Sequence, residues 1–106
     1  MKANGFIYLS GYCGLTPDAK LVGEGDMKKQ TDQVIKNLKV ILEQEGSSLN
    51  KIVKTNIFIT DMSRYKELNE VYSQYFTTHK PARSCVEVKS LPVPNAIVEI
   101  EAVALE

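Results

Sequence analysis

The side chains best suited to chemistry lie near the C-terminal end of this chain, on two short segments with the alternating pattern of β-strands. On the first segment, the alternation places Arg83, Cys85 and Glu87 on one face. On the second, it places Glu99 and Glu101 on one face, opposite a row of aliphatic residues. We therefore predict one polar face that carries a cation, a thiol and carboxylates, backed by a core face. Because charged side chains are rarely buried without partners, this polar face is either solvated surface or the lining of a site.

Two of these residues could act together on a small anionic substrate. The planar guanidinium of Arg83 can hold a carboxylate through two parallel hydrogen bonds, which a lysine cannot form. The carboxylate of Glu99 can accept a proton from a water molecule that attacks the substrate. The alternative for the same two residues is a structural ion pair between strands.

Other kinds of site find little support in the sequence. Cys85 could be a nucleophile, but the single histidine, His79, lies in a loop, so a packed thiol is the better interpretation. One histidine and two distant cysteines do not make a zinc site. Residues 11–14 lack the spacing of a phosphate-binding loop. We therefore expect no metal and no cofactor, and we interpret Cys13 as a small apolar filler or a chance surface thiol.

The composition indicates an ordinary intracellular protein whose overall charge produces no net electrostatic attraction to a charged partner. The 106 residues include 13 basic and 13 acidic side chains, so the formal net charge is zero and nothing steers the protein toward nucleic acid or membrane. Two cysteines are too few for a disulfide framework. No apolar segment has the length of a secretory signal or a membrane span. We expect a single domain over residues 1–106, located in the cytoplasm, with a mitochondrial location left open and no membrane partner.

The elements that must position these residues follow from the periodicity of the apolar side chains. Ahead of the two C-terminal strands we predict a strand at 6–10, a helix at 26–45, a strand at 52–60 and a helix from 65 to near 77. Asp26 is the expected N-cap of the long helix and Gly46 its C-terminal stop. Two helices on one face of a mixed sheet make an α+β two-layer fold. The bare sheet face then suits packing against copies of the chain, with sites between subunits.

The C-terminal motifs resemble those of a known family. Pro-Ala-Arg-Ser-Cys-Val-Glu-Val at 81–88 and Val-Glu-Ile-Glu-Ala-Val-Ala at 98–104 are similar to the RidA/YjgF family of reactive-intermediate deaminases, also known as L-PSP endoribonucleases. Ile-Tyr-Leu-Ser-Gly at 7–11 and Asn-Glu-Val-Tyr at 69–72 match in the same order. The resemblance implies a chorismate-mutase-like α+β fold, assembled as a homotrimer with three clefts between subunits. It also implies hydrolysis of 2-imino and enamino acids to 2-keto acids and ammonia, without metal or organic cofactor.

The resemblance further implies roles for five residues. The family's arginine at the position of Arg83 binds the substrate carboxylate, and its acid at the position of Glu99 positions the attacking water. The family's main-chain contacts fall on Gly11 and Cys85, and its asparagine of the second helix falls on Asn69. We therefore expect these five residues to form a site for small imino or keto acids.

Two departures from the family pattern lie near the expected pocket. The family carries a further N-terminal segment with a Gly-Pro-Tyr whose tyrosine lines the cleft, and these 106 residues do not include it. Tyr12 stands where the family commonly has glutamine. Two alternatives to the deaminase therefore stay open: an L-PSP-type endoribonuclease or translation inhibitor, and a non-catalytic trimer that binds small carboxylates or acts as a chaperone-like partner. Zero net charge and the lack of a basic stripe weigh against a nucleic-acid partner.

Overall fold

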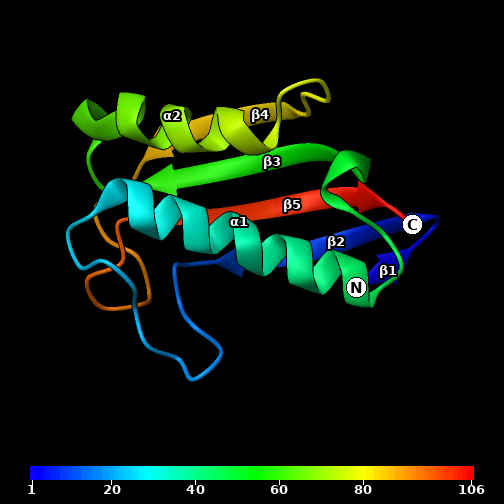
Figure 1. Cartoon of the computed structure of the whole chain (residues 1–106), viewed down its shortest axis with the longest axis horizontal. Helices are drawn as coiled ribbons and strands as arrows, with labels where there is room; N and C mark the ends of the chain where they lie inside the picture. The colour runs from blue at the N-terminus through cyan, green and yellow to red at the C-terminus, as the bar shows by residue number, and fades with distance from the viewer.

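In the computed structural model, which describes residues 1–106, two helices cover one face of a five-stranded sheet (Figure 1). The strands are β1 (Lys2–Ala3), β2 (Phe6–Tyr12), β3 (Ile52–Ile59), β4 (Ala82–Glu87) and β5 (Val98–Leu105). The helices are α1 (Met27–Gln44) and α2 (Tyr65–Tyr75), with short 3₁₀ turns η1 (Leu49–Lys51) and η2 (Met62–Arg64). The strand order is β1-β2-β5-β3-β4, in which only β3 and β4 pair in parallel. The predicted α+β two-layer architecture with a mixed sheet is confirmed.

The long helix α1 begins and ends at the residues that its sequence indicates. The Asp26 carboxylate accepts a hydrogen bond from the backbone N–H of Lys29 at 3.0 Å, as an N-cap does. At the other end Gly46 has a φ of +79°, and the N–H of Ser47 donates to the Leu42 carbonyl at 2.8 Å, which closes a Schellman motif. Both predicted helix ends are confirmed. Neither α1 nor α2 combines the length and the apolarity needed to cross a membrane.

The core lies between the two helices and the sheet face that they cover. On β5, Val98, Ile100, Ala102 and Ala104 are buried, whereas the residues between them are half-exposed. The alternation predicted for this strand is therefore confirmed. A cluster of 17 buried apolar residues from α1, α2 and the strands fills the layer, and each large aliphatic side chain in it contributes about 1.5–3 kcal/mol by leaving water.

A short hairpin at the N-terminus was not expected from the apolar pattern. The strand β1 has only two residues, pairs antiparallel with β2 and forms one edge of the sheet. Its turn is made by Asn4 and Gly5, with φ values of 54° and 85°. Two successive residues with positive φ make the type I′ turn that Asn-Gly favours in hairpins. The Asn-Gly dipeptide was the signal that could have predicted this element.

The register of the sheet decides which polar side chains share a face. Parallel pairing sets Arg83 beside Thr55, which is buried under α2. Antiparallel pairing sets Glu101 beside Asn56, and the side-chain amide of Asn56 donates to Glu101 at 3.0 Å. Glu99 shares a face with Glu101, because side chains alternate along a strand. Arg83 therefore faces the helix layer, and Glu99 and Glu101 lie on the helix-free face.

The predicted single polar face is thus wrong for this chain. Arg83 and Cys85 lie on the side of the sheet that the helices cover, whereas Glu99 and Glu101 lie on the other side. The alternation within each strand was predicted correctly, but the polar faces of the two strands were wrongly assigned to the same side of the sheet. The edge strand β4 explains the error, because its two faces differ little in exposure and Val86 on the helix-free face is 47% exposed.

Candidate functional site

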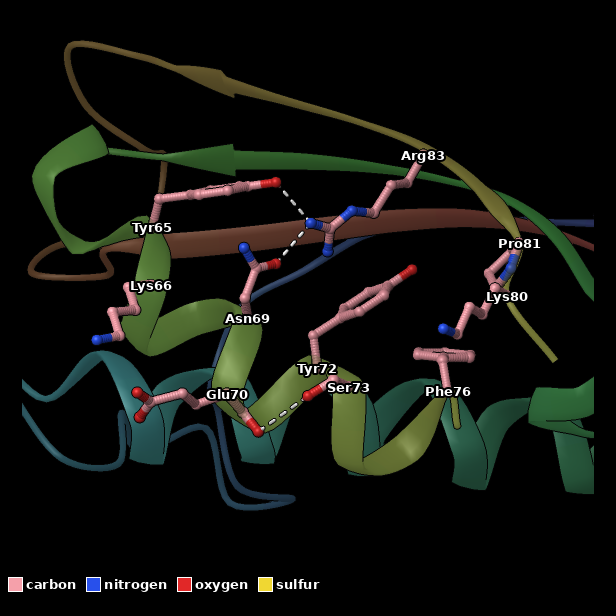
Figure 2. Close-up of a pocket in the computed structure, with 10 residues that line it drawn as sticks. All are labelled: Tyr65, Lys66, Asn69, Glu70, Tyr72, Ser73, Phe76, Lys80, Pro81 and Arg83. Atoms are coloured by element: carbon pink, nitrogen blue, oxygen red, sulfur yellow. Dashed lines mark hydrogen bonds between the residues drawn. The ribbon is translucent and has the colours of Figure 1, made fainter. Parts of the chain in front are cut away.

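Arg83 lies in a cavity of about 660 Å³ between α2 and the start of β4 (Figure 2). Its Nη2 donates hydrogen bonds to the hydroxyl of Tyr65 at 2.6 Å and to Oδ1 of Asn69 at 2.5 Å. Its guanidinium carbon also lies 4.7 Å from the centroid of the Tyr72 ring, a cation–π distance. The two hydrogen bonds and the ring contact together hold the guanidinium in one orientation inside the cavity.

The guanidinium of Arg83 retains donors for a ligand. Both of its hydrogen bonds within the chain use Nη2, so its other N–H groups are available. None of the five ion pairs in the chain includes Arg83. A partly buried, oriented guanidinium without a carboxylate partner is suited to bind the carboxylate of a small molecule through two hydrogen bonds.

The helix α2 supplies the residues that orient Arg83. Tyr65, Asn69 and Tyr72 are spaced by four and three residues, so they lie on one side of the helix. The Tyr72 hydroxyl shares a hydrogen bond of 2.9 Å with Thr55 on β3, and burial raises the pKa of Tyr72, so this hydroxyl stays neutral. Asn69 was expected in the site from the family resemblance. Tyr65 and Tyr72 were not predicted as site residues, because aromatic residues at helical spacing usually belong to the core.

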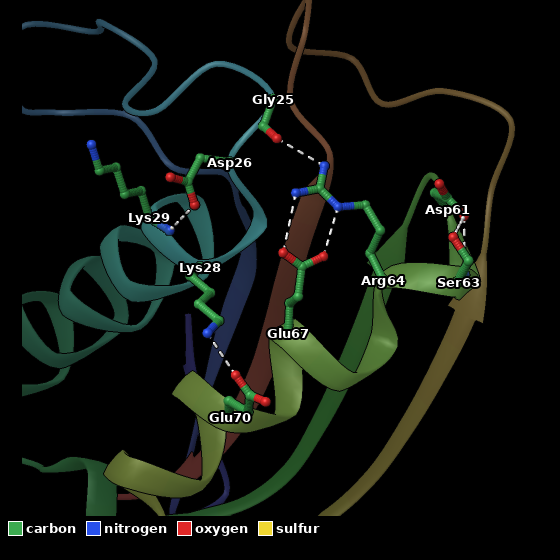
Figure 3. Close-up of polar contacts among 9 residues, drawn as sticks. All are labelled: Gly25, Asp26, Lys28, Lys29, Asp61, Ser63, Arg64, Glu67 and Glu70. Carbon is green, nitrogen blue, oxygen red and sulfur yellow. Dashed lines mark hydrogen bonds and ion pairs between the residues drawn. The ribbon is translucent and has the colours of Figure 1, made fainter.

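Polar contacts at the helix-layer surface set the position of α2 (Figure 3). The Arg64 guanidinium pairs with Glu67 at 2.9 Å and donates to the Gly25 carbonyl at 2.8 Å. Lys28 on α1 pairs with Glu70 on α2 at 2.6 Å. Exposed pairs of this kind each contribute little to stability, because solvent screens them. They tie α2 to α1 and to the loop before it, and so fix the helix that presents its side chains to Arg83.

Glu99 belongs to a second cavity, of about 650 Å³, at the end of β2. A Cβ added to Gly11 would lie 2.6 Å from Cδ of Glu99, so a larger residue at position 11 would push the Glu99 carboxylate out of its present position. The thiol of Cys13 donates a long hydrogen bond to Oε1 of Glu99, with 3.7 Å between sulfur and oxygen. Tyr12 and Val93 line the same cavity. Cys13 is therefore more than an apolar filler, because it orients the carboxylate of Glu99.

Within one chain the expected site falls into two parts. The structure brings Arg83 together with Asn69, and Gly11 together with Glu99. The two parts lie on opposite faces of the sheet. The alternative interpretation of Arg83 and Glu99 as an ion pair between strands is therefore wrong for the single chain.

Cys85 shares the covered face of β4 with Arg83 and packs against the apolar core. Burial raises the pKa of its thiol, and Arg83 opposes this only in part. His79 is engaged elsewhere, with its Nε2 2.5 Å from the carbonyl oxygen of Ile52. These contacts agree with a packed thiol at position 85. No group of three or more His, Cys, Asp or Glu side chains is placed to hold a metal ion.

The buried thiol of Cys13 should make stability depend on pH. Burial first, and Glu99 second, raise its pKa from 9.0 to about 11. The folded protein therefore holds this proton more tightly than the unfolded chain, so the stabilisation is complete below pH 9 and is lost as the pH rises through 11. Between these values the native chain should lose about 2–3 kcal/mol more stability than Cys13→Ala. Denaturant unfolding of both proteins across this pH range measures the difference. If the free energy of unfolding changes equally with pH in both, the prediction is wrong.

Comparison with known proteins covers the whole chain. The family model for endoribonuclease L-PSP matches residues 1–106. Protein HMF1 of Saccharomyces cerevisiae is 51% identical over 106 residues, which cover 100% of this chain and 81% of HMF1. Reactive Intermediate Deaminase A, chloroplastic, of Arabidopsis thaliana is 43% identical over 105 residues, which cover 98% of this chain and 55% of that protein.

Solved structures agree with the sequence relatives. The crystal structure of yeast Mmf1 matches with a TM-score of 0.94 and 50% identity, covering 99% of this chain and 82% of that one. The crystal structure of E. coli TdcF with bound serine matches with a TM-score of 0.91 and 33% identity, covering 100% of this chain and 84% of that one. The chain therefore belongs to the endoribonuclease L-PSP family, which is also called the YjgF/RidA family.

Proposed function

We propose that this protein hydrolyses small reactive 2-imino and enamino acids to 2-keto acids and ammonia. The observation that carries the proposal is the guanidinium of Arg83, held by Tyr65 and Asn69 in a cavity and free of any carboxylate of its own chain. The name of one relative and the bound ligand of another support the proposed class of substrate. One is named a reactive intermediate deaminase, and the TdcF structure holds serine, a small molecule with a carboxylate beside an amino-bearing carbon.

The proposed reaction needs a carboxylate holder and a group that handles water. Arg83 binds the substrate carboxylate and fixes the adjacent C=N carbon. A water oxygen then forms a bond to that carbon while its proton passes to Glu99, and the electron pair of the C=N bond moves to nitrogen. Glu99 returns the proton to nitrogen, which gives a carbinolamine. Glu99 then takes the hydroxyl proton and passes it to the amino nitrogen, so the C–N bond breaks, ammonia leaves and the oxygen forms the carbonyl. The sum is imine plus water to ketone plus ammonia.

The two-part site requires a second copy of the chain. Because Arg83 and Glu99 face opposite sides of the sheet, one substrate can meet both only if they come from different subunits. The helix-free face offers an interface, since Tyr8 is 48% exposed and Val86 47% exposed on it. We propose a homotrimer in which the Arg83 cavity of one subunit meets Glu99 of the next, which gives three sites.

The oligomeric state gives a direct prediction. The native protein at micromolar concentration should have the mass of three chains by light scattering or native mass spectrometry. Tyr8→Asp should shift the protein toward monomer, because it places a charge in the proposed interface at a site that is half-exposed in the single chain. Met62→Asp is the matched control, because Met62 is an apolar side chain, 37% exposed in η2, that lines none of the cavities. A native monomer, or a Tyr8→Asp trimer, would remove this proposal.

The proposed function is tested by following an imine directly. A PLP-dependent dehydratase generates 2-iminobutyrate, and added semicarbazide traps the imine that survives. With the protein present, less imine should be trapped and 2-ketobutyrate should appear faster than in spontaneous hydrolysis. If trapping is the same with and without the folded protein, the proposed function is wrong.

Endoribonuclease activity is the second candidate, because the matching family model bears that name. RNA binding through phosphates depends on released counterions, so it falls steeply with salt. With zero net charge, we expect weak RNA association that fades at physiological salt. RNA cleavage at that salt, abolished by Arg83→Ala, would put this candidate first. Saturable keto-acid binding without any turnover would instead favour the non-catalytic carboxylate-binding trimer.

A further inference from the structure

The cavity around Arg83 carries an excess of positive charge. Three of the side chains that line it are cations, Lys66, Lys80 and Arg83. Glu70 is the only carboxylate in the lining, and it is already paired with Lys28 at 2.6 Å. The whole chain has no net charge, so this local excess is not a general property of the surface. A cleft lined by one sign of charge concentrates ligands of the opposite sign.

Of the two lysines, Lys80 is the one with the less compensated charge. Neither has a carboxylate within ion-pair distance. Lys28 first, and Lys66 after it, lower the pKa of the Glu70 carboxyl group. Lys66 therefore lies near a carboxylate that partly compensates its charge. Lys80 lies at the other end of the cavity from Glu70 (Figure 2), so it does not share this carboxylate. Its ammonium is therefore available to a ligand.

The backbone holds Lys80 at the rim of the cavity. The preceding residue, His79, contacts the carbonyl oxygen of Ile52 on β3. The following residue, Pro81, has a fixed φ and leads into β4. The lysine stem is flexible, but its point of attachment is fixed on both sides. Lys80 and Arg83 therefore enter the same cavity from neighbouring positions of one segment.

An aromatic floor lies between these two cations. Figure 2 shows the rings of Tyr72 and Phe76 along the stretch of cavity from Arg83 to Lys80. The two ring centroids are 4.6 Å apart, and both residues are buried in the core beneath the cavity. Such a floor suits the methylene groups of a ligand. The wall thus presents a cation, an apolar stretch and a second cation in order.

We propose that the site selects 2-imino acids that carry a second carboxylate at the far end of a short methylene chain. This inference rests on the proposed function and names the substrate class of the same site. Arg83 binds the carboxylate next to the imine through its planar fork, and Lys80 binds the distal carboxylate as a mobile point charge. The distal carboxylate takes no part in the hydrolysis, which proceeds at the C=N carbon as above. The product is a 2-keto dicarboxylate.

Two imines of equal length test this selectivity. An amino-acid oxidase converts glutamate to 2-iminoglutarate and norvaline to 2-iminopentanoate, which differ only in a carboxylate against a methyl group. The ratio of their kcat/KM values cancels changes in the amount of active protein. The native protein should favour 2-iminoglutarate by roughly three- to tenfold, the range of one partly exposed charge pair. Calorimetric binding of 2-ketoglutarate and 2-oxopentanoate should show the same order.

Lys80→Met should bring the ratio to one or below, because methionine keeps the length of the stem and loses the charge. Lys39→Met is the matched control, since Lys39 is exposed on α1, lies outside every ion pair and does not line the cavity. It should leave the ratio at the native value. A native protein that favours 2-iminopentanoate, or a Lys80→Met ratio equal to the native one, overturns this inference alone. If the native protein accelerates neither imine, the proposed function fails with it.

Discussion

Replacing Arg83 by alanine should remove both keto-acid binding and turnover. The guanidinium is the only cation of the cavity that side chains of the chain hold in a fixed orientation. Loss of a preorganised group of this kind costs about 2–4 kcal/mol of transition-state stabilisation, or some hundredfold in kcat/KM. Arg83→Lys keeps the charge but loses the planar fork, so it should fall between the native protein and Arg83→Ala. Initial rates of imine hydrolysis and calorimetric titration with 2-ketobutyrate measure the two effects.

Stability separates this prediction from a structural role for Arg83. The residue takes part in no ion pair, and its partners Tyr65 and Asn69 face the cavity. Removing it leaves those two groups open to water, so the melting temperature and the oligomeric state should change little. The control is Lys39→Ala, which removes an exposed cation of α1 that lies outside every ion pair and lines no cavity. Native binding and turnover in a folded Arg83→Ala trimer would show that the carboxylate binds elsewhere.

Local signals in the sequence predicted the elements that carry the site. Asp26 and Gly46 are the residues that helix ends require, and they mark α1 correctly because capping depends on a few neighbouring backbone groups. The alternation along β5 identifies its buried face, because this strand lies inside the sheet between two neighbours. Arg83 and Glu99 were predicted as site residues from their chemistry, and Asn69 only from the family resemblance.

Relations between distant parts of the chain could not be predicted in this way. How β4 and β5 each pair with β3 decides which of their faces lie on the same side of the sheet. Because β4 is an edge strand, its two faces differ little in exposure, so the sequence pattern does not reveal this. For this reason Arg83 and Glu99 were placed on one face. The contact from Cys13 to Glu99 joins residues 86 positions apart, and no local pattern encodes it. The role of Tyr65 depends in the same way on where α2 lies relative to β4.

Glu99→Gln should separate turnover from binding, because it keeps the shape of the side chain and removes the base. Turnover of 2-iminobutyrate should fall by about a hundredfold, since general acid–base catalysis contributes about 10²–10⁴ in rate. Binding of 2-ketobutyrate should stay within about twofold of the native value, because Arg83 still holds the carboxylate. The contrast with Arg83→Ala, which loses both, is what identifies one residue as the holder and the other as the group that handles water.

The chain offers a matched control for this change on the same strand. Glu101 lies two residues further along β5 on the same face, but its carboxylate accepts a hydrogen bond from Asn56 at 3.0 Å and lies outside the cavity of Glu99. Glu101→Gln makes the same chemical change and should leave turnover near the native rate. Light scattering on each sample shows whether the trimer persists, so that loss of assembly is not mistaken for loss of chemistry. If Glu99→Gln remains trimeric and hydrolyses the imine at the native rate, Glu99 does not act on the water. If it remains trimeric but loses keto-acid binding as severely as Arg83→Ala, its carboxylate shapes the binding cavity instead.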